Sequence, residues 1–221
     1  MGIVARIVAT LCLVGLALCC YFMISLSRQA KAQSSPGNLF DVPLHPVTEP
    51  MWQKARAVAG RTAPNFTLPD QLGKSVTLSE ECKRGPVVLV FTKDGCPCSV
   101  EAQPLFNDLS TANPGVTFLG IIDGPQHVAS KYKEDFRVPY RMLLAGDGAI
   151  FGSFDAKQSV YTTLIGQDGK VIKQWPGYNK AMIVELNEDL AKAANASAKP
   201  LDVSMAPDKL SSGCKFERAG S

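Results

Sequence analysis

The sequence lacks any marked excess of charge of one sign. Lysine and arginine together number 23 and aspartate and glutamate 20, which gives a formal net charge of +3 over 221 residues. The chain has no basic block and no alternation of basic with aromatic residues, the pattern typical of a nucleic-acid surface. We therefore expect no nucleic-acid partner.

Histidine is also scarce, since the chain holds only His45 and His127. A soft ion such as Cu(I) takes cysteine and histidine ligands, so a metal site would have few residues available. We expect no metal ion and no cofactor. A Cu(I)-handling binding module stays an alternative, because Cys96 and Cys98 stand one residue apart.

Apolar residues, by contrast, make up 46% of the chain, which is enough for a core. No internal repeat is visible, so we expect one globular domain with extensions. The longest uncharged apolar stretch is IVATLCLVGLALCCYFMISL, residues 7–26. At about 1.5 Å per residue, a helix of this length would cross a hydrocarbon core of about 30 Å. We predict that residues 1–26 form a single membrane anchor.

Other fates of this N-terminal segment stay open. An A-x-A pattern at residues 30–32 would allow signal cleavage and secretion, and Cys19 would allow a lipoprotein. Basic residues flank both ends of the apolar run, so the positive-inside rule does not decide the orientation.

The rest of the chain divides into three parts. Residues 27–59 carry four prolines among scattered apolar residues, so we predict a tether with one short helix within EPMWQKARAV. Residues 60–195 show regular hydrophobic patterning and form the predicted domain. Residues 196–221 are polar, and we predict a flexible C-terminal tail that contains Cys214.

Within the domain, apolar runs alternate with segments of helical spacing. PNFTLPDQLGKSVTLSEE predicts a hairpin, and three continuous apolar runs predict buried strands: PVVLVFT, VTFLGII and YRMLLA. VYTTLIG and KVIKQW predict a second hairpin through QDG, and KAMIVELNEDLAKAA predicts a closing helix. This order indicates an α/β fold with a mixed central sheet flanked by helices and preceded by the first hairpin.

Of the seven cysteines, four lie outside the apolar N-terminal run: Cys82, Cys96, Cys98 and Cys214. Cysteines in such numbers suit an oxidising compartment. Cys214, in the polar tail, could resolve a disulfide, pair with Cys82 or stay free. Cys82 precedes the first buried strand and is expected to be structural or inert.

The segment Cys96-Pro97-Cys98 falls where that strand ends and the helix SVEAQPLFNDL begins. A helix N-terminus stabilises an anion, so a thiol there becomes a thiolate more easily. Pro97 suits the first helical position, which needs no N–H. We expect Glu101 in the first turn, Cys96 as the more exposed attacking thiolate and Cys98 as its resolving partner. The reverse order and a redox-inactive structural pair remain alternatives.

Four segments, taken in order, resemble the thioredoxin-like superfamily and its redoxin branch, the alkyl hydroperoxide reductase and thiol-specific antioxidant family with its membrane-anchored thiol-disulfide oxidoreductases. These segments are GRTAPNFTLPDQLGKSVTLSE, GPVVLVFTKDGCPCSVEAQP, VPYRMLLAGDGAIFGSFDA and VYTTLIGQDGKVIKQWPGY. The resemblance implies a thioredoxin-like fold and thiol chemistry. It departs from the family at Gly95, which stands in the place of a tryptophan, and at Tyr161, which replaces a cis-proline and should narrow access to the cysteines.

The function implied by this resemblance is a membrane-tethered thiol-disulfide oxidoreductase that uses Cys96 and Cys98, with Glu101 as a proton acceptor. Its partners would be protein thiols and disulfides or a thioredoxin-type electron donor. Anchored relatives imply the bacterial inner membrane, with the domain facing the periplasm or the exterior. A peroxiredoxin-like thiol peroxidase, with Cys98 or Cys214 as the resolving thiol, is the main alternative.

Overall fold

The structure is a computed structural model that describes residues 2 and 45–217 of the chain. The predicted anchor at residues 7–26 lies outside the described residues. Within the described ranges, no helix is long and apolar enough to cross a membrane. Membrane tethering therefore stays a prediction.

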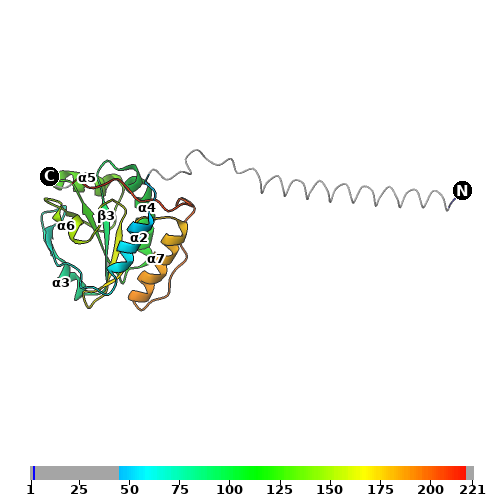
Figure 1. Cartoon of the computed structure of the whole chain (residues 1–221), viewed down its shortest axis with the longest axis horizontal. Coiled ribbons are helices and arrows are strands. Elements are labelled where there is room, and N and C mark those ends of the chain that lie inside the picture. The colour runs from blue at the N-terminus through cyan, green and yellow to red at the C-terminus, as the bar shows by residue number, and fades with distance from the viewer. Residues whose placement is uncertain (1, 3–44, 218–221) are drawn as a thin grey trace. The chain divides into compact units, whose positions relative to one another are not determined.

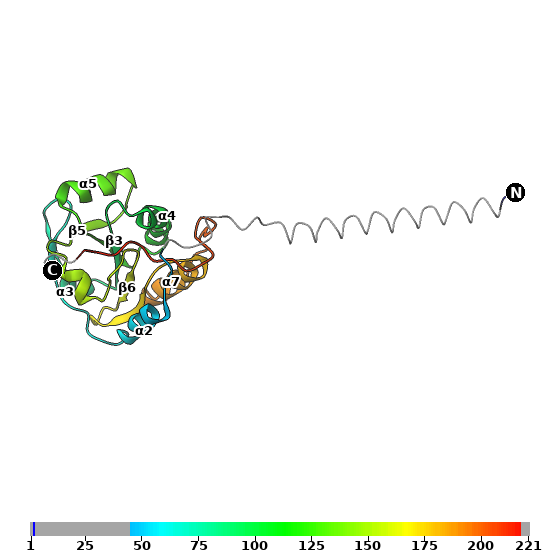
Figure 2. The same ribbon diagram turned by 45° about the horizontal axis from the view of Figure 1, so that its top comes forward.

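A five-stranded mixed sheet forms the centre of the domain, with the strand order β5-β4-β3-β6-β7 (Figures 1 and 2). The central strand β3 runs parallel to β4 and antiparallel to β6. The outer pairs are parallel for β4 with β5 and antiparallel for β6 with β7. The strands are β3 (Val87–Thr92), β4 (Thr117–Ile122), β5 (Arg141–Leu144), β6 (Thr162–Ile165) and β7 (Val171–Trp175). The predicted α/β fold with a mixed sheet is confirmed.

Both predicted hairpins are present. The first joins β1 (Thr67–Pro69) to β2 (Ser75–Thr77) in antiparallel register. The second joins β6 to β7, with Gly169 at a φ of +74° in the turn. Glycine adopts this left-handed conformation without the strain that a Cβ would add, which is why the QDG sequence makes the turn.

Strand β3 shows why the sheet is covered on both faces. All six of its residues are buried, and successive side chains point to opposite faces. Val88 and Val90 enter one apolar cluster, whereas Leu89 and Phe91 enter the other. The unbroken apolar run in the sequence is thus explained by burial on both sides.

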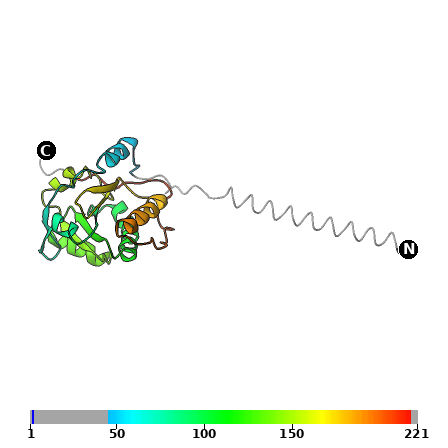
Figure 3. The ribbon, with the colours of Figure 1, turned by 90° about the horizontal axis from the view of Figure 1, so that it is seen from below.

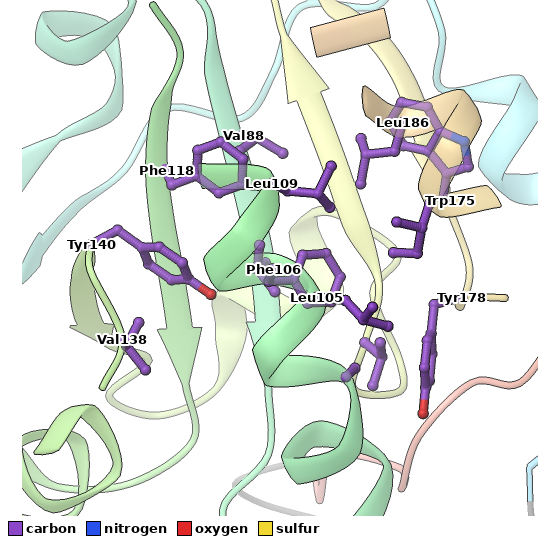
Figure 4. Close-up of a cluster of buried hydrophobic side chains, with 14 of the residues drawn as sticks. Val88, Leu105, Phe106, Leu109, Phe118, Val138, Tyr140, Trp175, Tyr178 and Leu186 are labelled. Atoms are coloured by element: carbon purple, nitrogen blue, oxygen red, sulfur yellow. The ribbon is translucent and has the colours of Figure 1, made fainter. Parts of the chain in front are cut away.

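Five described helices cover these faces: α3 (Leu78–Cys82), α4 (Pro97–Ala112), α5 (Gln126–Asp135), α6 (Ala149–Ser153) and α7 (Lys180–Ala193). Helices α4, α5 and α7 supply the first cluster, and Figure 4 shows Leu105, Phe106 and Leu109 of α4 packed toward the sheet. Helices α3 and α6 supply the second cluster.

The remaining described helix, α2 (Glu49–Ala57), matches the short helix predicted within the tether. It packs against β7 on the outside of the domain, and its Ala55 is 1% exposed (Figure 3). Residues 49–57 are therefore packed on the domain, whereas the sequence placed them in a tether.

The C-terminal tail also differs from its prediction. Ser211 and Tyr178 exchange two backbone hydrogen bonds, and the N–H of Ser212 donates to the carbonyl of His45 at 2.7 Å. Ser212 is completely buried, and the ring of Phe216 stacks on Phe151 with centroids 3.7 Å apart. Figures 1 and 2 show this red segment crossing the domain beside α4. The prediction of a loose tail is thus corrected for residues 210–217, because these contacts bind them to the domain.

Candidate active site

The turn between β3 and α4 places the cysteine pair. The ammonium of Lys93 contacts the Asp123 carboxylate at 3.0 Å, and the N–H of Asp94 donates to the same carboxylate at 2.8 Å. Gly95 follows with a φ of +66°. A tryptophan would be strained in this conformation, which gives a physical reason for glycine where the family has tryptophan.

Cys96 and Pro97 occupy the positions that the sequence predicted. Cys96 is the N-cap of α4, and Pro97 is its first residue. Cys98 follows within the first turn, so both thiols lie at the positive end of the helix dipole. Glu101 lies beyond the first turn, which contains no acidic residue, and its side chain is exposed. Its predicted first-turn position is corrected, because the helix begins only at Pro97.

The relative exposure of Cys96 and Cys98 differs from the prediction. Cys96 is 1% exposed and Cys98 4% exposed, so Cys96 is not the more exposed of the pair. Ser159 and the tail residue Cys214 lie against Cys96 and cover it.

The sulfur of Cys96 is surrounded by hydrogen-bond donors. The hydroxyl of Ser159 lies 3.3 Å from it, and the N–H of Cys214 lies 3.2 Å from it. Hydrogen bonding from the Cys98 thiol, followed by donation from Cys214 and Ser159, lowers the pKa of Cys96 far below its ordinary value, although burial opposes the shift. These contacts favour the thiolate form of Cys96.

The two neighbouring thiols behave in the opposite way. The hydrogen bond to Cys96, together with burial, raises the pKa of Cys98. Burial, with the hydrogen bond to Cys96, raises the pKa of Cys214 to about 11. The arrangement favours the thiolate form at Cys96 and the protonated form at its two neighbours, Cys98 and Cys214.

His45 joins this group from a segment that the sequence assigned to the tether. Its Nε2 lies 3.6 Å from the Sγ of Cys214. Sequence reasoning missed the contact because no local pattern links residues 169 positions apart.

Ser159 and Gly213 were also missed. Ser159 is completely buried, and a Cβ on Gly213 would lie 1.9 Å from its Oγ. Only glycine lets the tail approach this closely. Gly213 before Cys214 is the one sequence signal of this close approach.

Tyr161 is not placed as predicted. It belongs to the apolar cluster that contains Phe91 and Cys82, whereas Cys96 belongs to the other cluster. It lines a cavity of about 740 Å³ together with Phe216 of the tail. The hydroxyl of Ser159 in this loop lies against the Cys96 sulfur, whereas the cluster of Tyr161 contains neither Cys96 nor Cys98, so the predicted place of Tyr161 beside the cysteines is corrected.

Glu101 influences Tyr178, a buried residue that sequence reasoning also missed. Burial, followed by the negative charge of Glu101, raises the pKa of Tyr178. Glu101 therefore lies close enough to this tyrosine to affect it electrostatically. Among the described residues, no group of three or more histidine, cysteine, aspartate or glutamate side chains is arranged to hold a metal ion.

Comparison with known proteins identifies the family of the chain. The family model described as AhpC/TSA matches residues 59–174, more than half of the chain. The chain is 28% identical over 141 residues to the thiol-disulfide oxidoreductase ResA of Bacillus subtilis, covering 62% of this chain and 78% of that protein. It is 28% identical over 131 residues to peroxiredoxin Bcp of the same organism, covering 52% of this chain and 83% of that protein.

A solved structure shows the same fold. A secreted disulfide oxidoreductase of Mycobacterium tuberculosis superposes with a TM-score of 0.51 at 22% identity, covering 57% of this chain and 95% of that one. The α/β fold is thus thioredoxin-like. On the match to residues 59–174, the chain belongs to the AhpC/TSA family.

Proposed function

We propose that the protein is a thiol-disulfide oxidoreductase in which Cys96 attacks and Cys98 resolves. The observation that carries the proposal is the set of donors around the Cys96 sulfur, which hold it as a thiolate between protonated thiols. Thiolates, and not thiols, attack disulfides.

The exchange would run in two steps. The Cys96 thiolate attacks one sulfur of a partner disulfide, forms a mixed disulfide and releases the other partner sulfur as a thiolate. Cys98 then gives up its proton and attacks the Cys96 sulfur, which leaves a Cys96–Cys98 disulfide and a fully reduced partner. Loss of the Cys96 charge in the first step removes one cause of the raised Cys98 pKa, so it favours the second step. We assign Glu101 as the proton acceptor.

The partners we propose are protein thiols and disulfides or a thioredoxin-type electron donor. The relationship to ResA supports this choice. We further propose that residues 7–26 tether the domain to a bacterial inner membrane, with the domain on the periplasmic or outer side.

The test is reduction of a protein disulfide by the reduced full-length protein, followed by mapping of the disulfides formed. Cys96→Ser should abolish the reaction, and the double variant Cys98→Ser/Cys214→Ser should trap the mixed disulfide. Cys82→Ser is the matched control, because Cys82 lies in the other cluster. Full activity of Cys96→Ser would refute the proposal.

A peroxidase is the second candidate, and the position of Cys214 against Cys96 favours it. A hydroperoxide would oxidise the Cys96 thiolate to a sulfenic acid and leave as an alcohol. Cys214 or Cys98 would then displace water and form a disulfide. Hydroperoxide consumption that needs Cys96, measured without any protein disulfide, would establish this activity.

A further inference from the structure

We propose that Cys214 and His45 form a second resolving pair, in which Nε2 of His45 accepts the thiol proton as Cys214 attacks the sulfur of oxidised Cys96. The inference rests on the proposed attack by Cys96 and adds a route for the step that follows it.

The backbone holds Cys214 in place against Cys96. Its N–H donates to the Cys96 sulfur at 3.2 Å, and its carbonyl accepts from the N–H of Ser159 at 2.9 Å. The N–H of Gly213 donates to the Ser159 carbonyl at 3.0 Å. These contacts fix the tail on both sides of the attacking residue.

His45 is fixed to the same tail. Its carbonyl accepts from the N–H of Ser212 at 2.7 Å, and its Nε2 lies 3.6 Å from the Cys214 sulfur. Both His45 and Cys214 are partly buried. An imidazole beside a thiol is a suitable proton acceptor for a nucleophilic cysteine.

The charge on Cys96 would set the order of events. While Cys96 is a thiolate, its negative charge and its hydrogen bond favour the protonated form of Cys214. The positive charge of Lys93 favours the thiolate form of Cys214. Once Cys96 has formed a mixed disulfide, that negative charge is gone. Cys214 then loses its proton more easily, and His45 is in position to take it.

The step balances without a further oxidant. Cys214 attacks the Cys96 sulfur of the mixed disulfide, the bond between Cys96 and the partner breaks, and a Cys96–Cys214 disulfide forms. The partner leaves as a thiolate and receives the proton from His45. The partner is reduced by two electrons, and the two cysteines supply them.

The test uses full-length Cys98→Ser protein, in which Cys214 is the remaining resolving thiol at the site. Oxidised glutathione is added, the reaction is stopped with acid, and mass spectrometry measures Cys96–glutathione and Cys96–Cys214 over time. Cys214→Ser in this background should accumulate Cys96–glutathione.

His45→Ala and His45→Gln are then compared with His127→Ala, which removes the other histidine. Each His45 variant should slow formation of Cys96–Cys214 by about tenfold or more, while the rate of glutathione addition stays within about twofold. Added imidazole should restore the rate of His45→Ala.

Three results would overturn the inference. An unchanged rate of Cys96–Cys214 formation would exclude His45, and equal slowing of both steps would indicate a purely structural role. If glutathione never adds to Cys96, the proposed function fails and the inference fails with it. If glutathione adds but the His45 variants behave in either of the first two ways, the inference alone fails.

Discussion

The backbone N–H of Cys214 donates a 3.2 Å hydrogen bond to the sulfur of Cys96, a residue 118 positions earlier in the chain. The contact places the C-terminal segment over the N-terminus of α4 and leaves Cys96 1% exposed. The properties of this thiolate therefore depend on residues of the tail and of the 157–159 loop as much as on the helix that carries it.

Ser159→Ala removes one donor to the Cys96 sulfur. Since a hydrogen bond to a charged group contributes about 1.5–3 kcal/mol, we expect the pKa of Cys96 to rise by about one or two. The pH dependence of iodoacetamide alkylation at Cys96 measures this. Tyr161→Phe is the control, and an equal effect of both variants would contradict the assignment of Ser159.

The low pKa of Cys96 also predicts how stability depends on pH. The thiol has a pKa of about 8.5 in the unfolded chain. Below that pH the unfolded chain binds a proton at Cys96 that the folded protein does not bind. The stabilisation of the fold by the Cys96 thiolate therefore decreases as the pH falls. Between about pH 6 and 8, the advantage of the parent over Cys96→Ser should grow by up to about 1.4 kcal/mol per pH unit. Urea unfolding at several pH values measures the difference, and a constant difference would contradict a depressed pKa.

Gly213→Ala should displace the tail, because the new Cβ would lie 1.9 Å from the Ser159 Oγ. We expect alkylation of Cys96 to accelerate by about tenfold or more and stability to fall by about 1–3 kcal/mol. Gly152→Ala is the matched control, since a Cβ there meets no atom within 4 Å. Unchanged alkylation of Gly213→Ala would show that the tail does not limit access.

Gly95→Ala tests the strain in the turn before Cys96. No atom lies within 4 Å of an added Cβ, so the cost comes from the φ of +66° alone. We expect a loss of about 1–2 kcal/mol in the free energy of unfolding, measured by urea denaturation. A gain in stability would contradict the strain argument.

Local sequence determined the framework of the site. The apolar run of β3 and the Cys96-Pro97-Cys98 segment that follows were readable because strand burial, N-capping and the fixed φ of proline act between near neighbours. The same holds for the two hairpins and for α7.

Tertiary structure decided what surrounds the cysteines. His45, Ser159 and Cys214 contact Cys96 or each other across long sequence separations, and apart from Gly213 no neighbouring residue in the sequence indicates the contact. Local preferences fix where strands and helices form, whereas the pairing of distant segments depends on packing of the whole domain. The sequence by itself thus determined where the cysteine pair lies, and only the folded chain decided which groups surround the Cys96 sulfur and favour its thiolate form.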